Sequence, residues 1–146
     1  MTAYNLNPIT ARNAGDAREW SVCAHFGIAR TAHDAQSYDK ASDLEANGHG
    51  YSVKSSGASL MSGALCEGRT EFADIWNLYA ERVHSDRFVY VTENWTAYEM
   101  SLNEFGEFIR NFGRCERESS KNGGAMKIRL RKESSKMVAW LERHAA

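Results

Sequence analysis

The chain has few of the residues that mark several large classes of protein. It holds three cysteines, Cys23, Cys66 and Cys115, with no Cys-x-x-Cys pair, and a single proline, Pro8. This cysteine pattern argues against a disulfide scaffold and against a cysteine zinc site, and it suits a reducing cytoplasm. The longest uncharged stretch, residues 55–66, is too short and too polar to span a bilayer, and the N-terminal stretch lacks the apolar core of a signal peptide. We therefore expect a cytoplasmic protein with no membrane partner.

What the chain does contain is typical of one globular domain with an uneven distribution of charge. It has 146 residues, of which 42% are hydrophobic and 25% are charged, so we expect a single domain over residues 1–146. Residues 1–109 hold 8 Lys and Arg against 15 Asp and Glu, whereas residues 110–146 hold 10 against 4. An acidic front suits metal binding and a basic back suits phosphate binding. The alternative is that the basic segment is an ordinary solvated surface.

Periodicity and turn signals predict helices and strands along the whole chain. Asn13 and Thr70 are expected N-caps, and Asn47-Gly48 predicts a hairpin turn that His49-Gly50 lengthens. The expected elements are helices over 13–26, 70–83, 102–112 and 133–144, a short strand over 28–31, two strands flanking residues 47–50, and strands over 87–92, 96–101 and 126–131. The order α-β-β-β-α-β, followed by a strand, a helix, a strand and a helix, predicts a mixed α/β domain with a central sheet.

The hairpin carries the residues most suited to chemistry. Asp43 stands near the end of its first strand, and Ser52 and Lys54 share one face of its second strand. An acid beside a lysine at the ends of neighbouring strands suits metal-assisted hydrolysis of a phosphodiester. The carboxylate binds Mg²⁺, while the ammonium group orients the attacking water or helps to deprotonate it. The alternative is a cross-strand ion pair worth about 0–1 kcal/mol.

These residues resemble the PD-(D/E)xK nucleases of the restriction-endonuclease-like fold. That family's α-β-β-β-α-β core has a mixed central sheet flanked by helices, with an acid on one strand and (D/E)-x-K on the next. Asp43 and Lys54 match the acid and the lysine, while Ser42 stands in place of the family proline and Ser52 in place of the second acid. The resemblance covers residues 13–92, and the C-terminal strand and helix expected from the periodicity are added to that core.

The missing second acid has a candidate replacement further along the chain. Some restriction enzymes of this family carry Ser-x-Lys and supply the acid about a dozen residues after the lysine. Here 12 residues separate Lys54 from Glu67, and Glu71 is the substitute if Glu67 points away. The resemblance thus implies that Asp43, Glu67 and the backbone carbonyl of Val53 hold the metal.

A further acid lies in the first expected helix. Glu19 shares a helical face with Cys23 and Phe26, and an acid on an apolar face is costly unless it is paired. The run Gly15 to Glu19, with Phe26-Gly27 after it, resembles the first helix of archaeal-type Holliday-junction resolvases. That resemblance implies that Glu19 acts as an outer ligand or as a water-orienting acid. The alternative is a glutamate that extends to solvent beside the helix.

Basic and hydroxyl residues provide candidates for binding a nucleic-acid backbone. Lys127, Arg129 and Arg131 alternate along one expected strand at a spacing of roughly 6–7 Å, which matches successive phosphates. Small hydroxyl residues near the lysine leave room for phosphate and donate to it. The complete set of predicted nucleic-acid-binding residues is Ser55, Ser56, Lys127, Arg129, Arg131, Lys132 and Lys136.

Together these features predict a single nuclease-like domain that acts as a magnesium-dependent DNA endonuclease. Mn²⁺ is expected to substitute for Mg²⁺, and a homodimer is expected because cutting two strands needs two sites. The catalytic residues would be Asp43, Lys54, Glu67 and Glu19, and the enzyme would be of a restriction, junction or phage type. Two alternatives remain open: an RNase or tRNase toxin domain on the same scaffold, and a non-catalytic nucleic-acid-binding module that has lost the second acid.

Overall fold

The computed structural model describes residues 1–28, 44–60, 68–117 and 126–146. The strands among these residues are β1 (Thr2–Asn5), β2 (Leu44–Ala46), β3 (His49–Lys54), β4 (Arg87–Val91), β5 (Thr96–Ser101), β6 (Gly113–Arg117) and β7 (Met126–Leu130). The helices are α1 (Ala14–His25), α3 (Phe72–Arg82), α4 (Leu102–Phe112) and α5 (Ser135–Ala145). None of the helices among these residues has the length and the apolar character that a membrane span requires.

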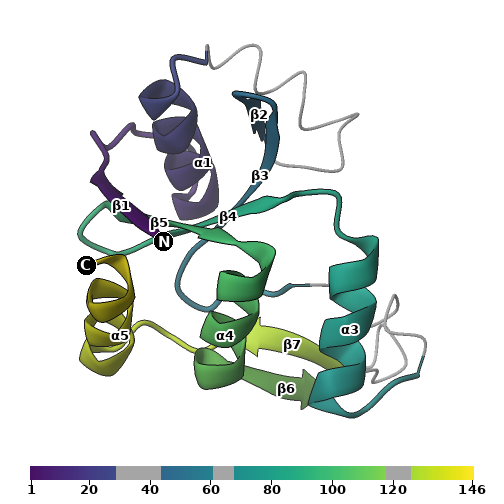
Figure 1. The fold of residues 1–146 in the computed structure, drawn as a ribbon. Helices are drawn as coiled ribbons and strands as arrows, with labels where there is room; N and C mark the ends of the chain where they lie inside the picture. Colours follow the sequence, from purple (N-terminus) through teal and green to yellow (C-terminus); the bar gives the residue numbers. More distant parts are fainter. Residues whose placement is uncertain (29–43, 61–67, 118–125) are drawn as a thin grey trace.

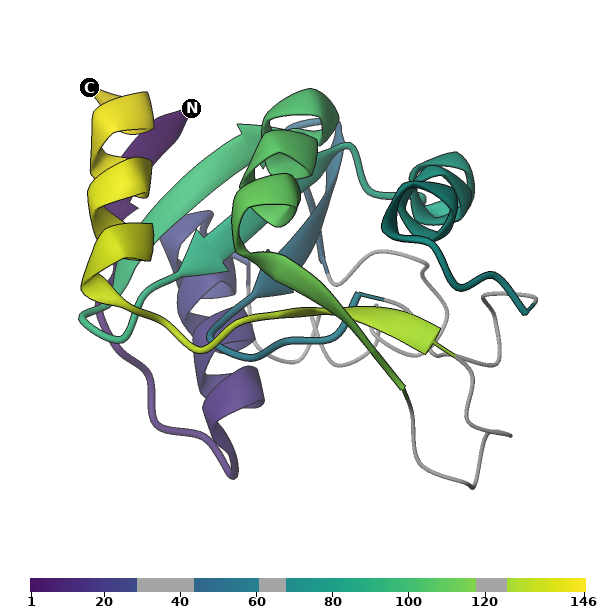
Figure 2. The ribbon, with the colours of Figure 1, turned by 90° about the horizontal axis from the view of Figure 1, so that it is seen from below.

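A five-stranded mixed sheet in the order β1-β5-β4-β3-β2 organises the molecule (Figure 1). Strands β3 and β4 run parallel, and the other neighbours are antiparallel. Helix α1 covers one face of the sheet, and α3, α4 and α5 lie on the other side (Figures 1 and 2). The expected mixed α/β sheet flanked by helices is therefore confirmed.

The β2–β3 hairpin closes in two residues, so the expectation that His49-Gly50 lengthens the turn is wrong. Asn47 has a φ of 53° and Gly48 a φ of 79°. Both values suit a two-residue turn of type I′, which matches the twist of the flanking strands. His49 and Gly50 are the first residues of β3, where they pair with Ala46 and Glu45.

The predicted helices and most predicted strands are confirmed, with differences at their ends. Asn13 caps α1 by accepting a hydrogen bond from the backbone N–H of Asp16 at 2.8 Å. Helix α3 begins at Phe72, with Glu71 in the capping position and no side-chain cap, so Thr70 is not its N-cap. The expected strand over 28–31 lies outside the described residues except for Ile28, which belongs to no strand.

Two strands were not predicted, and both form through pairing with distant partners. Strand β1 pairs with β5 at one edge of the main sheet. Strand β6, which reads Gly-Arg-Cys-Glu-Arg, pairs with β7 to make a separate two-stranded sheet. The C-terminal part thus contributes two strands and a helix in place of one strand and a helix, because antiparallel pairing overrides the weak strand character of β6.

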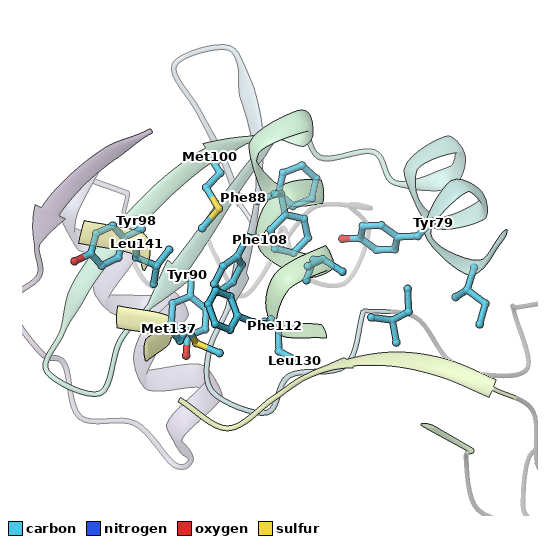
Figure 3. Close-up of a cluster of buried hydrophobic side chains, with 14 residues drawn as sticks. Tyr79, Phe88, Tyr90, Tyr98, Met100, Phe108, Phe112, Leu130, Met137 and Leu141 are labelled. Atoms are coloured by element: carbon cyan, nitrogen blue, oxygen red, sulfur yellow. The ribbon is translucent and has the colours of Figure 1, made fainter. Parts of the chain in front are cut away.

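Two apolar clusters fill the space on either side of the main sheet. The smaller cluster joins α1 to the sheet through Val22, Cys23, Tyr51 and Val53. The larger one joins the opposite face to α3, α4, α5 and β7 (Figure 3). At its centre Phe88 stacks on another aromatic ring, that of Phe105, with ring centroids 4.5 Å apart. Each face of the sheet is therefore fixed by its own core.

Candidate active site

The C-terminal ends of the parallel strands β3 and β4 lie at one edge of the sheet, and Lys54 is the last residue of β3. Lys54 stands directly opposite Tyr90 of β4 in the register. Tyr51 and Val53 belong to the cluster beneath α1, and strand side chains alternate, so Ser52 and Lys54 project from the opposite face. Lys54 and Tyr90 therefore share that face of the sheet.

A glutamate from the segment before α5 lies at this end of the sheet. The Tyr90 hydroxyl donates to Glu133 Oε1 at 3.0 Å, and the backbone N–H of Glu93 lies 3.2 Å from each Glu133 carboxylate oxygen. The backbone N–H of Glu133 donates to Ser56 Oγ at 2.8 Å. Residue 133 thus ties together the segments that follow β3 and β4.

In this hydrogen bond Tyr90 is the donor, because its hydroxyl stays protonated. Burial raises the pKa of Tyr90 well above its ordinary value, and the charge and hydrogen bond of Glu133 raise it further. The hydroxyl therefore stays protonated at neutral pH, and it donates while Glu133 accepts. The result is a carboxylate held in place beside the strand end that carries Lys54.

Helix α1 reaches the same region from the other face of the sheet. Its Arg18 guanidinium lies 5.2 Å from the ring centre of Trp95, in the β4–β5 turn, and is close enough to oppose the rise in the pKa of Tyr90. The next residue, Glu19, is half-buried, and Cys23 on its helical face is buried in the core. Since α1 packs against β3, Glu19 could approach Lys54 only around the end of that strand, and its catalytic role stays a prediction.

The other predicted ligand positions differ in what the structure describes. Asp43 and Glu67 lie outside the described residues. Val53 is described, and its side chain lies in the core beneath α1. Glu71, the substitute for Glu67, is exposed at the start of α3, where it helps burial to raise the pKa of the Cys115 thiol. Glu71 therefore lies beside the two-stranded sheet.

The donors described at this edge are compatible with magnesium as one part of a ligand set. Within residues 1–28, 44–60, 68–117 and 126–146, no three His, Cys, Asp or Glu side chains gather as a metal site. Magnesium, however, usually takes only one or two carboxylates and completes its shell with carbonyl, water and substrate oxygens. The Glu133 carboxylate and the backbone oxygens at the end of β3 are donors of that kind.

The predicted basic residues divide into two groups. Lys127 and Arg129 project from the face of β7 opposite to the buried Ile128 and Leu130. Arg129 is bound on the protein itself, because its Nε donates to Glu116 at 2.5 Å and one terminal nitrogen donates to the carbonyl of Gly57 at 2.9 Å. The expected row of three cations is therefore interrupted at its centre.

The second group follows β7 and continues into α5. Arg131, Lys132 and Lys136 are all exposed. The predicted hydroxyl residues lie nearby, because Ser56 accepts the hydrogen bond from Glu133 and the carbonyl of Ser55 accepts one from Ala58 in a tight turn. The side chain of Ser56 thus supports the protein backbone.

Two residues of this edge, Tyr90 and Glu133, were not identified from the sequence. Tyr90 belongs to the predicted buried strand Phe-Val-Tyr-Val, and a buried tyrosine hydroxyl usually needs a hydrogen-bond partner. That requirement was the available signal. The identity of the partner, 43 positions further along the chain, depends on the tertiary fold.

His49, by contrast, is separate from this edge. His49 lies at the opposite end of β3, where its Nδ1 is 2.6 Å from Asp86 Oδ2, and the backbone N–H of Gly50 donates to the other Asp86 oxygen at 2.9 Å. These hydrogen bonds hold the hairpin turn against the start of β4.

No protein-family model, curated protein or solved structure matches this chain, so its activity is inferred from the candidate site itself.

Proposed function

We propose that the protein is a magnesium-dependent DNA endonuclease with the restriction-endonuclease-like core. The observation that carries this proposal is the position of Lys54 at the end of β3, beside parallel β4 and the edge that also holds Glu133. The described order α1, β2, β3, α3, β4 supports part of that α-β-β-β-α-β core, namely the hairpin, the helix and the returning parallel strand. The remaining strand, expected over 28–31, lies outside the described residues except for Ile28.

Each proposed catalytic residue has a distinct task. Lys54 positions the attacking water and offsets the negative charge that develops on the phosphate in the transition state. Asp43, Glu67 and the Val53 carbonyl are the proposed metal ligands, and Glu19 orients water from outside that shell. Bound Mg²⁺ supplies Lewis-acid polarisation of the phosphate oxygens.

Glu133 adds a second candidate for the acid that is absent at position 52. Ser52 is buried, with 8% of its surface exposed, and it carries no charge. Glu133 is held by Tyr90 and Glu93 on the side of the sheet from which Lys54 projects. Its carboxylate is therefore positioned without any contribution from β3. Replacing Glu67 and Glu133 singly by glutamine decides between them, because only the true ligand should shift the Mg²⁺ dependence of cleavage to higher concentration.

The direct test uses supercoiled plasmid with Mg²⁺, with Mn²⁺ and with EDTA. We expect nicking or linearisation in either metal and none in EDTA. Lys54→Met keeps the aliphatic length of the side chain but removes the charge, and it should abolish cleavage even at saturating DNA. Lys127→Met, which removes one cation from β7, should only raise the amount of protein needed.

The result also separates the two alternative functions. No cleavage of DNA with metal-dependent cleavage of tRNA would replace the proposal by an RNase of the toxin type. No cleavage of either substrate, together with no Mg²⁺ or Mn²⁺ shift in melting temperature, would leave a nucleic-acid-binding module. We further propose that two copies act together on duplex DNA, which a mass measurement on the free and DNA-bound protein tests.

A further inference from the structure

A pocket of about 420 Å³ lies between α4, α5 and the segment that joins β7 to α5. Its wall includes Asn111 and Phe112 at the end of α4 and Arg131 just after β7. The remaining wall includes the helix α5 residues Lys136, Trp140 and Arg143. Cavities of this size accommodate small organic ligands.

Helix α5 separates charges of opposite sign onto its two sides. Lys136, Trp140 and Arg143 are spaced at i, i+4 and i+7 and so lie on one face, which lines this pocket. The opposite face, which carries Glu142, lines a different surface hollow together with Glu93 and Glu133. The pocket is therefore positive because of how residues are placed around the helix, although the whole chain carries a net charge of −1.

The three cations of the pocket are unpaired within the described part of the chain. The side chains of Arg131, Lys136 and Arg143 make no hydrogen bond or ion pair with any other described residue. This distinguishes them from Arg129 and Arg110, which are paired with Glu116 and Glu107. Three such cations around one concave site attract a phosphate group, because each can neutralise its charge without first giving up an ion pair within the described structure.

An aromatic ring and an amide complete the pocket. Trp140 stacks on His144 with ring centroids 3.8 Å apart and packs edge-on against Phe112 at 5.8 Å, so its indole is fixed while it remains half-exposed. The side-chain amide of Asn111 donates to the carbonyl of Glu107 at 2.8 Å. The Oδ1 atom of Asn111 can then accept a hydrogen bond from a ligand. A fixed indole beside phosphate-binding cations suits a nucleobase joined to a phosphate.

The segment that carries Arg131 is hydrogen-bonded to the segment that follows Lys54. The carbonyl of Arg131 accepts a hydrogen bond from the backbone N–H of Gly57 at 3.4 Å, and Glu133 is bonded to Ser56. Gly57 and Ser56 follow Lys54 by three and two residues. A strand that runs from Lys54 along the segment 55–57 would therefore reach the backbone of Arg131, whose residue lines the pocket.

We propose that this pocket binds one unpaired nucleotide of a nucleic-acid strand, with its phosphate on Arg131, Lys136 and Arg143 and its base against Trp140. This rests on the proposed function for the identity of the strand, and it specifies that the substrate has an unpaired nucleotide close to the cleavage site. The chemistry recognised is that of a nucleoside phosphate, which a strand or a free nucleotide can supply.

Binding is measured in EDTA, where no cleavage occurs, by fluorescence anisotropy of a short labelled single strand and of a blunt duplex of the same sequence. We expect the single strand to bind at least about tenfold more tightly than the duplex. The double variant Arg131→Gln/Arg143→Gln should bind the single strand about tenfold more weakly. The plot of the logarithm of the association constant against the logarithm of the salt concentration should also become less steep, by about 0.7 for each phosphate that the variant no longer neutralises.

The matched control is Arg12→Gln/Arg110→Gln, which removes the same charge outside the pocket and should change the affinity less than about twofold. Trp140→Phe serves as the aromatic variant, because phenylalanine retains packing against Phe112. The indole N–H signal that disappears from the NMR spectrum of this variant is that of Trp140. That signal should shift when the single strand binds. Competition with a deoxynucleoside monophosphate, with the nucleoside and with inorganic phosphate identifies the source of the ligand.

Equal weakening in the two double variants would overturn the proposal, because it would indicate general electrostatic attraction. Equal affinity for duplex and single strand, or an unmoved Trp140 signal, would also overturn it. Lys54→Met separates this proposal from the proposed function: it should abolish cleavage, while the Trp140 signal should still shift when the single strand binds. Binding that meets these expectations in a protein without nuclease activity would support the pocket and reject the nuclease.

Discussion

The hydrogen bond between Tyr90 and Glu133 gives the sharpest prediction about the candidate active site. Tyr90→Phe removes only the hydroxyl that holds the Glu133 carboxylate, while the ring remains in a fully buried position. Because Glu133 is bonded in turn to Ser56 and Glu93, the substitution should loosen the segment before α5 as well as remove one hydrogen bond.

The size of the effect follows from the burial of the two partners. A hydrogen bond to a charged group contributes about 1.5–3 kcal/mol net. Glu133 is half-exposed and keeps the backbone N–H of Glu93, so water can partly replace the missing donor. We therefore expect Tyr90→Phe to lower the free energy of unfolding by about 1–2 kcal/mol. Tyr98→Phe, at a position whose hydroxyl bonds to no other described residue, should cost less than about 0.5 kcal/mol.

Urea unfolding followed by tryptophan fluorescence measures both variants, with equal m-values required for the comparison. Glu133→Ala completes a double-mutant cycle with Tyr90→Phe, and we expect a coupling energy of about 1 kcal/mol. If Tyr90→Phe costs the same in the presence and in the absence of Glu133, the bond does not stabilise the edge and the reasoning fails. Loss of cleavage without loss of stability would instead indicate a direct role for the hydroxyl.

Two further predictions concern the frame around the site. Gly113→Ala should destabilise by about 1–3 kcal/mol, because the added Cβ would lie 2.6 Å from the carbonyl oxygen of Ile109 although the φ of −89° is ordinary. Gly15→Ala, in a helix with space for a Cβ, should instead gain up to about 0.5 kcal/mol, and the opposite order in thermal melts would contradict this geometry. The hydrogen bond with His49 lowers the pKa of Asp86. The ionised Asp86 therefore stabilises the folded protein above the ordinary pKa of an aspartate, and this stabilisation is lost as the pH falls through the lowered pKa. Asp86→Asn should therefore melt below the parent protein at neutral pH, and a difference that persists in strong acid would refute the pairing.

Much of the secondary structure could be predicted from local sequence. Asn-Gly sets the hairpin because both residues tolerate a positive φ, and the apolar stripe of α3 has helical spacing whatever surrounds it. The alternation along β7 likewise predicted which side chains are buried. These signals are local, because each depends on residues within one or two turns of the same element.

The strands β1 and β6 could not be predicted, because neither has a strong pattern of its own. Each becomes a strand by satisfying its backbone hydrogen bonds on a partner, β5 for β1 and β7 for β6. For β1 that partner lies more than 90 residues away in the chain. Pairing over such a separation is a property of the assembled sheet.

The sequence by itself determined the candidate chemistry: which residues can act as acids, cations and hydroxyls, and on which strand face Lys54 lies. Only the tertiary structure decided which of these groups meet. It brought Glu133 to Tyr90, tied Arg129 to Glu116 and left Arg131, Lys136 and Arg143 together around one pocket. The physical reason is that charge and hydrogen-bonding capacity belong to single residues, whereas pairing depends on distances between elements that the chain brings together only when it folds.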